Sequence, residues 1–365
     1  MDAVDIVIPL LTAFGVSACL TPLAGRLARR FGVVDHPSER SVSRRQNVPL
    51  MGGLSVAAGA GVALGLGLLI GDQVVPATHL LGLAAGAVIV LALGICDDRF
   101  GLGASAKFAG QVMAAVVAIA AGFELGHITE PITQTTYFLP RPVVWLASVL
   151  WIVGVTNALN LIDGLDGLAT GVGAIICATL AVILWQAGQP FGVLLGVALL
   201  GGLLGFLPFN FPPARIFLGD TGALFIGYTL ALLSLEGYRQ VTVLTFVVPM
   251  LALAVPILDT GLSILRRART GRSPFRADRL HIHHRLLAVR GSPRAAVLQF
   301  YFLTACFSLI AVSFTDLQGS VAAVCLVVVF LLTLRLLANL GVLRLSGTDE
   351  VVVPGTPPSA EEEPP

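Results

Sequence analysis

The sequence has few charged residues for its length. Only 12% of its 365 residues are charged, whereas 56% are hydrophobic, and the mean hydropathy is +0.90. An average soluble chain is about one quarter charged, so this balance lies well outside the soluble range. The scarcity of charge excludes a soluble globular fold and predicts a polytopic membrane protein.

Several motifs of covalent and redox chemistry are also lacking. The 5 cysteines lie in or at the edge of apolar runs, and no two have the C-x-x-C spacing. They therefore predict helix packing rather than disulfides or metal ligation. No Gly-x-Ser-x-Gly nucleophile, P-loop or kinase motif is present, so we expect neither a serine nucleophile nor ATP as a phosphate donor.

The sequence contains a single lysine. Lys107 is the only lysine among the 22 basic residues, and all the others are arginines. A lysine ammonium is compact, whereas a guanidinium is a wide planar fork, so the two are not interchangeable in a confined site. The lone lysine indicates either a requirement for a compact cation or the chance survival of one residue.

Apolar runs long enough to cross a membrane recur along the chain. About 20 helical residues span the ~30 Å hydrocarbon core. We therefore expect an all-α membrane protein of about eleven transmembrane helices, a single domain over 1–345, and a disordered cytoplasmic tail over 346–365. The runs lie near 4–24, 52–71, 78–96, 108–123, 142–159, 171–187, 192–209, 221–236, 241–264, 297–314 and 319–340.

The basic residues predict how these helices are oriented. If the N-terminus lies outside, the alternating loops place only Arg141 and Arg239 on the outer side and the other loop arginines, with Lys107, on the inner side. Positive charge accumulates in cytoplasmic loops. The first run lacks a basic leader and a small-residue cleavage site, so we expect it to be retained. The N-terminus is then outside and the C-terminus cytoplasmic.

Polar clusters interrupt the apolar sequence at the predicted cytoplasmic side. Acids at membrane depth cost free energy unless they face partners, water or a ligand, so they indicate a functional site. For the segment 157–168, a polar helix end with capping residues is the alternative. At residues 97–98 a helix cap does not explain the sequence, because a cap would need one acid and two adjacent acids are present. The clusters are Asp97-Asp98, the segment 157–168 with Asn160, Asp163 and Asp166, Gly219-Asp220-Thr221-Gly222, and the segment 279–286 with His281, His283, His284 and Arg285.

The position of these clusters favours an enzyme over a transporter. A transporter usually keeps its polar site near the bilayer midplane, whereas these clusters share one interface, where a lipid can meet a water-soluble substrate. Carboxylates that repel each other suit a divalent cation or a shared proton, and many arginines suit phosphate, which together predict magnesium-assisted phosphoryl chemistry. A proton-coupled transporter with a relay of Asp163, Asp166 and Asp259 is the alternative, although Asp259 could also pair with a neighbouring helix.

Two further segments have open interpretations. The glycines of Pro49-Leu-Met-Gly-Gly53 could let backbone N–H groups point at an anion at a helix N-terminus, but a tight loop with topogenic arginines is the favoured interpretation. The histidine cluster suits phosphate better than zinc, because its neighbours are cationic.

Five motifs, in this order, resemble those of the polyprenyl-phosphate N-acetylhexosamine-1-phosphate transferases. The resemblance covers roughly residues 20–290. Leu50 and the His281-Ile-His283-His284-Arg285 pattern are similar to the GlcNAc-1-phosphate transferase branch rather than the phospho-MurNAc-pentapeptide transferase branch, which typically has three consecutive histidines. The motifs are "PLMGG", "DDRFGLGASAK", "NALNLIDGLDGLATG", "FNFPPARIFLGDTG" and "HIHHRL".

The resemblance implies a function. It is the transfer of GlcNAc-1-phosphate from UDP-GlcNAc to undecaprenyl or decaprenyl phosphate, with release of UMP, as the first membrane step of cell-envelope polymer synthesis. A MurNAc-pentapeptide or other UDP-HexNAc donor is the alternative within the family. The implied cofactor is Mg²⁺, with Mn²⁺ left open as a substitute. The implied partners are UDP-GlcNAc, the polyprenyl phosphate and the bilayer, with a homodimer left open and no nucleic acid. The implied location is the bacterial cytoplasmic membrane, with the active site on its cytoplasmic face.

The resemblance also implies roles for individual residues. Asp220 is similar to the magnesium-binding aspartate of the family, with Asp98 as a second ligand, and Asp97 is expected to accept or steer the proton of the lipid phosphate. We expect direct attack of the lipid phosphate on the β-phosphorus, and a transient phosphoaspartate at Asp98 is the alternative. The other expected catalytic residues are Lys107, Asp163, His281, His283 and His284, and the expected substrate-binding residues are Arg45, Asn160, Asp166, Asn210, Phe217 and Arg285.

Overall fold

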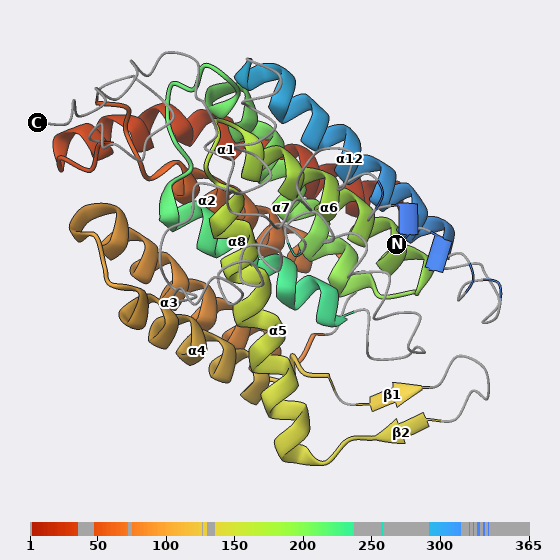
Figure 1. Ribbon diagram of the computed structural model, residues 1–365. Helices are drawn as coiled ribbons and strands as arrows, with labels where there is room; N and C mark the ends of the chain where they lie inside the picture. Colours follow the sequence, from red (N-terminus) through yellow and green to blue (C-terminus); the bar gives the residue numbers. More distant parts are fainter. Residues whose placement is uncertain are drawn as a thin grey trace, which may run out of the picture.

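The computed structural model describes residues 2–35, 47–71, 75–125, 127–129, 136–236 and 292–314, with isolated positions at 257 and between 321 and 335. Within these ranges the regular elements are helices, apart from one short hairpin, and loops connect them (Figure 1). The elements are α1 (Ala3–Arg30), α2 (Gly52–Ile70), α3 (Ala77–Phe100), α4 (Ala104–Ala120), β1 (His127–Thr129), β2 (Thr136–Phe138), α5 (Arg141–Ile162), α6 (Leu168–Gln186), α7 (Pro190–Asn210), α8 (Gly219–Glu236) and α12 (Pro293–Phe314).

The described helices establish a polytopic α-helical membrane protein. Seven of them, α1 to α3, α5 to α7 and α12, are long and apolar enough to cross a membrane. Helix α4 is a shorter apolar helix, and α8 is almost completely buried by the others. The predicted span near 241–264 and the predicted tail over 346–365 lie outside the described residues apart from Ile257, and the span near 319–340 is described only at isolated positions. The number of eleven spans therefore stays a prediction.

Helix α8 lies at the centre of the bundle. It packs against α2, α3, α5 and α6, and Leu230, Ala231 and Leu232 have no exposed surface. Lipid tails are as apolar as these side chains, so close packing rather than water exclusion selects the contacts between membrane helices. A helix surrounded in this way can hold a polar residue at its end without exposing it to lipid.

Glycines bring two helices against the start of α8. A Cβ atom at Gly53 of α2 would overlap the backbone of Gly222, and one at Gly94 of α3 would overlap the backbone of Thr221. Small residues allow such backbone-to-backbone approach in membrane proteins. Glycine at these two positions therefore lets α2 and α3 approach the start of α8 closely.

The segment before α2 is joined to the segment before α8 by backbone hydrogen bonds. The N–H groups of Gly52 and Gly53 donate to the carbonyl oxygens of Phe217 and Leu218, both at 3.0 Å, and the N–H of Phe217 donates to the carbonyl of Pro49 at 2.9 Å. These donors are engaged inside the protein, which favours the tight-loop interpretation of residues 49–53 over anion binding by the two glycines.

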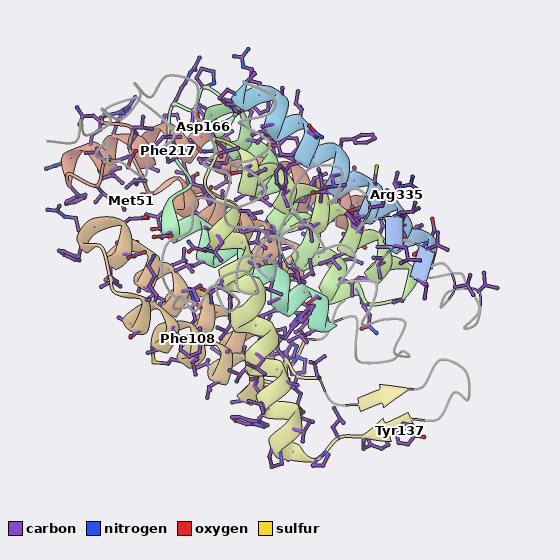
Figure 2. The ribbon with its side chains drawn as sticks, in the orientation of Figure 1. Met51, Phe108, Tyr137, Asp166, Phe217 and Arg335 are labelled. Atoms are coloured by element: carbon purple, nitrogen blue, oxygen red, sulfur yellow. The ribbon has the colours of Figure 1, made fainter. Side chains whose placement is uncertain are left out.

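The two ends of the bundle differ in character. Figure 2 shows Met51, Asp166 and Phe217 toward one end and Tyr137 at the other. The β1–β2 hairpin pairs His127 with Phe138 in antiparallel register and lies beyond the start of α5 (Figure 1). At the hairpin end, α3 is tied to α8 by His79, whose Nε2 lies 2.6 Å from Glu236 Oε1 in a buried site. The predicted polar clusters at 97–98, 157–168 and 219–222 belong to the opposite end.

Candidate active site

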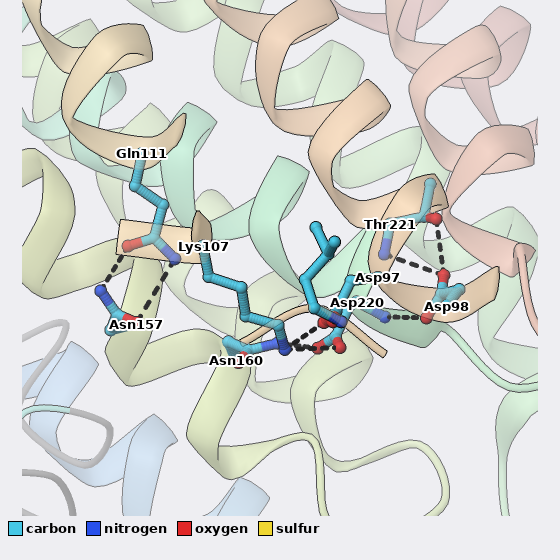
Figure 3. A network of polar contacts seen from close by, with 9 residues as sticks. Asp97, Asp98, Lys107, Gln111, Asn157, Asn160, Asp220 and Thr221 are labelled. Atoms are coloured by element: carbon cyan, nitrogen blue, oxygen red, sulfur yellow. Dashed lines mark hydrogen bonds and ion pairs between the residues drawn. The ribbon is translucent and has the colours of Figure 1, made fainter. Parts of the chain in front are cut away.

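A single ammonium group contacts two carboxylates where α3, α4 and α8 meet. Lys107 Nζ donates a hydrogen bond to Asp220 Oδ2 at 2.9 Å and forms an ion pair with Asp97 Oδ2 (Figure 3). Asp97 comes from the last turn of α3, Lys107 from the first turn of α4, and Asp220 from the first turn of α8. The cation offsets the repulsion between two acids that the fold brings together.

Asp98 faces a different partner from its neighbour. Its Oδ1 accepts the backbone N–H of Asp220 at 2.8 Å, and its Oδ2 accepts the backbone N–H and the hydroxyl of Thr221 at 3.1 and 2.6 Å. A carboxylate at the first N–H groups of a helix satisfies donors that have no partner within the helix and faces the positive end of its dipole. Asp98 therefore caps α8 from α3 and fixes the backbone that carries Asp220.

The second oxygen of Asp220 is held from α5. Asn160 Nδ2 donates to Asp220 Oδ1, so the carboxylate is oriented by Asn160 on one side and Lys107 on the other (Figure 3). Asp97 is likewise fixed, because its Oδ1 accepts the N–H of Leu102 at 2.7 Å while its Oδ2 faces the ammonium. Four helices thus contribute to one polar cluster of Asp97, Asp98, Lys107, Asn160 and Asp220.

The turn between α5 and α6 adds two more acids. Asp163 follows the last residue of α5, and Gly167 has a positive φ of 72°, a conformation that favours glycine. Asp166 Oδ2 accepts the N–H of Ala214 at 2.9 Å, which joins this turn to the segment after α7. The chain between α5 and α6 is therefore a short turn rather than continuous helix.

Asp163 lies in a region of excess negative charge. Removal of water by the surrounding protein, together with the negative charges of Asp220, Asp98 and Asp166, raises the pKa of Asp163 well above its usual value. Among the described residues of the polar cluster, the single positive charge of Lys107 does not neutralise this group of acids. The site consequently favours an additional cation or a proton.

The segment between α7 and α8 is held by buried amide contacts. Asn210 is only 2% exposed; its Nδ2 donates to the carbonyl of Ile216 at 3.1 Å, and its Oδ1 accepts the hydroxyl of Thr170 at 2.7 Å. These bonds fix the loop that leads to Phe217 and Asp220. The predicted contact of Asn210 and Phe217 with a uridine stays a prediction.

Helix α12 supports both the α5–α6 turn and the α7–α8 segment through two side chains that no sequence motif marks. Tyr301 Oη donates to the carbonyl of Gly167 at 2.5 Å, and Arg294 Nε donates to the carbonyl of Pro212 at 2.8 Å. Neither residue lies in a recognisable motif, and each acts on a backbone oxygen, so no sequence pattern marks it. The remaining predicted site residues, Arg45, Asp259, His281, His283, His284 and Arg285, lie outside the described residues.

The donor set of the cluster suits a hard divalent cation. Within the described part of the chain, no group of three or more His, Cys, Asp and Glu side chains is arranged to hold a metal by itself. Mg²⁺ does not need such a cage, because it keeps several waters and usually takes one or two carboxylates together with substrate phosphates. Asp220, which is 30% exposed in its side chain, and Asp97 provide carboxylate oxygens of this kind.

The Asp163→Asn variant should unfold at a higher temperature than the wild type at neutral pH without divalent cations. The folded state holds the proton of Asp163 more tightly than the unfolded chain does, so its carboxylate form destabilises the fold above the usual pKa of aspartate. The gain should shrink as the pH falls toward that usual pKa. Thermal unfolding in detergent measures it. Asp166→Asn, which alters a carboxylate that accepts the N–H of Ala214, should give no gain, and a lowered unfolding temperature for Asp163→Asn would contradict this account.

Known proteins are similar to this chain over most of its length. Residues 80–238, which include the cluster, match the model of glycosyl transferase family 4. The chain is 38% identical over 313 residues to a probable undecaprenyl-phosphate N-acetylglucosaminyl 1-phosphate transferase of Bacillus subtilis, covering 85% of each chain. It is 37% identical over 321 residues to the decaprenyl-phosphate N-acetylglucosaminephosphotransferase of Mycolicibacterium smegmatis, covering 80% of this chain and 77% of the relative.

A more distant relative is also named as an N-acetylglucosaminyl 1-phosphate transferase. The chain is 29% identical over 327 residues to the undecaprenyl-phosphate alpha-N-acetylglucosaminyl 1-phosphate transferase of Escherichia coli, covering 85% of this chain and 83% of the relative. The predicted resemblance is thereby confirmed. The chain belongs to glycosyl transferase family 4, in the branch of the undecaprenyl- and decaprenyl-phosphate N-acetylglucosamine-1-phosphate transferases.

Proposed function

We propose that this protein transfers GlcNAc-1-phosphate from UDP-GlcNAc to a polyprenyl phosphate, undecaprenyl or decaprenyl, and releases UMP. The observation that carries the proposal is the Lys107 ammonium between Asp97 and Asp220 at one end of the bundle, in a chain similar over most of its length to transferases named for this reaction. A cation among hard oxygen donors at a membrane surface suits two phosphate-bearing substrates, one in the lipid and one in water.

The roles of the site residues follow from their contacts. Lys107 would leave part of its contact with the acids to neutralise the diphosphate of the nucleotide sugar, and Asp97 would then accept or steer the proton of the lipid phosphate. Asn160, Asp163 and Asp166 would orient the nucleotide and diphosphate from the α5–α6 side. His281, His283, His284, Arg285 and Arg45 are proposed to complete the site with cationic and hydrogen-bonding groups.

Mg²⁺ is the proposed cofactor, with Mn²⁺ as a substitute, and it would supply positive charge to the diphosphate oxygens when bound. Asp220 is the proposed main ligand. Asp98 would have to share oxygens that already accept three hydrogen bonds from α8. Asp97, which is only 7% exposed but whose Oδ2 faces the same ammonium as Asp220, is the alternative second donor.

The three hydrogen bonds that Asp98 accepts from α8 favour a one-step reaction over a covalent intermediate at Asp98. In this route an oxygen of the lipid phosphate forms a bond to the β-phosphorus while the bond from that phosphorus to the bridging oxygen breaks, and UMP departs with the bridging oxygen. A phosphoaspartate at Asp98 would instead require a carboxylate engaged as the cap of α8 to become a nucleophile, and α8 would lose that cap.

We further propose eleven transmembrane helices in the bacterial cytoplasmic membrane, with the N-terminus outside, the C-terminus in the cytoplasm and the site on the cytoplasmic face. The ends of α3, α5 and α7 and the starts of α4 and α8 carry the polar residues, as alternating helices would have them. Helix α8 ends at the hairpin end, whereas α12 begins beside Pro212 at the site end. One predicted span near 241–264 accounts for this change of side.

The function is tested by incubating the purified protein with Mg²⁺, polyprenyl phosphate and each UDP-sugar in turn. UMP and a lipid-linked product should form with UDP-GlcNAc and not with UDP-MurNAc-pentapeptide. Asp220→Asn should lower turnover at least about a hundredfold, because removal of one charge-stabilising group typically costs that much, while the protein stays folded. Transport by sealed vesicles without a lipid-linked product, or wild-type turnover in the variant, would contradict the proposal.

The one-step route is tested by positional isotope exchange. UDP-GlcNAc labelled with ¹⁸O at the bridge between its two phosphorus atoms is incubated with the enzyme and Mg²⁺ but without lipid acceptor. The label should stay in the bridge, because the bond can break only when the lipid phosphate attacks. Scrambling of the label into the non-bridging positions would support the phosphoaspartate route instead.

A further inference from the structure

A pair of side-chain amides connects α4 to α5 beside the polar cluster. Gln111 Nε2 donates to Asn157 Oδ1 at 3.3 Å, and Asn157 Nδ2 donates in return to Gln111 Oε1 at 2.5 Å (Figure 3). Asn157 Nδ2 also donates to the carbonyl of Val153 at 2.9 Å. Gln111 is only 2% exposed. The buried amide of Gln111 and the half-buried amide of Asn157 therefore satisfy each other at the contact between α4 and α5.

The pair lies one turn from two residues of the site. Gln111 follows Lys107 by four residues on α4, and Asn157 precedes Asn160 by three residues on α5. Residues at these separations share one face of a helix. Lys107 and Asn160 hold the two oxygens of Asp220, so the amide pair joins the two helices directly behind the groups that orient this carboxylate.

A reciprocal amide pair sets more than the distance between two helices. Apolar contacts are not directional, whereas the two hydrogen bonds of one amide pair depend on angle as well as distance. The pair therefore restrains both the height and the rotation of one helix relative to the other. Loss of Asn157 would leave the buried Gln111 amide without these two hydrogen bonds, and loss of Gln111 would remove both bonds from the half-buried Asn157 amide. The packing would have to accommodate either loss by a shift. Helix α4 is short, with 17 residues, and packs against α3 and α5, so a shift of α4 against α5 would carry Lys107 with it.

We propose that Gln111 and Asn157 form a positioning pair that sets the register of α4 against α5, so that Lys107 and Asn160 reach Asp220 together. The pair does not touch the substrates; it acts through Lys107 and Asn160. Its kinetic consequence rests on the proposed function, but its effect on Lys107 does not. The two effects can therefore be measured separately.

The first readout uses the fact that Lys107 is the only lysine of the chain. An amine-selective acylating reagent can modify it and the α-amino group and no other lysine, and mass spectrometry of the peptide gives its rate of modification. The ammonium held by Asp97 and Asp220 should react slowly in the wild type. In Gln111→Leu and Asn157→Leu the rate should rise severalfold, because Lys107 no longer meets both acids.

The second readout is turnover with UDP-GlcNAc and polyprenyl phosphate. Both single variants should lower kcat by about tenfold to about a hundredfold, since a displacement of about 1 Å at reacting groups has effects of this size, with a smaller change in KM. The exchanged variant Gln111→Asn/Asn157→Gln keeps one amide of each length and should restore much of kcat and the slow modification of Lys107.

Ser234→Ala provides the matched control. Ser234 Oγ accepts a hydrogen bond from Trp151 Nε1 at 2.8 Å, so it also joins α5 to another helix through a buried polar contact. It lies about 21 Å along α8 from Asp220, at 1.5 Å per residue. Its loss should change stability without changing the reactivity of Lys107 or kcat.

The proposal is overturned if both single variants fold and keep the wild-type reactivity of Lys107 and the wild-type kcat, or if Ser234→Ala changes them equally. Should Gln111→Leu fail to fold, Gln111→Met and the exchanged variant decide by the same two readouts. If the wild type transfers no sugar phosphate while the variants still expose Lys107, the proposed function fails and the positioning pair stands. If the wild type is active and Lys107 stays unreactive in the variants, the proposed function stands and the positioning pair fails.

Discussion

The structure depends on one ion pair network at the end of a helix bundle, in which Lys107 separates Asp97 from Asp220. Carboxylates at membrane depth are expensive unless they are paired or hydrogen-bonded. Each of these two acids therefore has a second contact, Leu102 N–H for Asp97 and the Asn160 amide for Asp220. The network is tolerated because every charged group in it has a partner on a different element.

The same constraint explains why α8 is the central helix. Its first turn carries Asp220, its N-terminal N–H groups are capped by Asp98, and glycines of α2 and α3 allow the neighbouring backbones to approach it closely. A side chain at Gly53 or Gly94 would push α8 away and with it the carboxylate. The adjacent acids Asp97 and Asp98 thus divide into one that faces the ammonium and one that holds the helix.

Some of this arrangement could be predicted from the sequence. The apolar runs predicted the described helices, and the one-sided distribution of acids predicted that Asp97, Asp163 and Asp220 belong to one end of the bundle. These features depend on local composition or on alternating topology, both of which a single sequence contains.

Other features could not be predicted because they depend on how distant helices face each other. Nothing in the sequence around Asp98 indicates that its oxygens meet α8, and nothing around Gln111 indicates a partner on α5. Tyr301 and Arg294 donate hydrogen bonds to backbone carbonyls, which have no side-chain signature. The Pro-Leu-Met-Gly-Gly segment was ambiguous for the same reason, because its N–H groups bond to the backbone of Phe217 and Leu218, far away in the sequence.

The most direct test of the account is the turnover of Lys107→Arg with UDP-GlcNAc and polyprenyl phosphate. The wider guanidinium cannot meet Asp97 and Asp220 as the compact ammonium does, so turnover should fall at least about tenfold, in line with the loss of one oriented charge, while the unfolding temperature stays close to that of the wild type. Arg215→Lys, at an exposed position of the same end, should keep wild-type turnover. Wild-type turnover in Lys107→Arg would contradict the central place given to this ammonium.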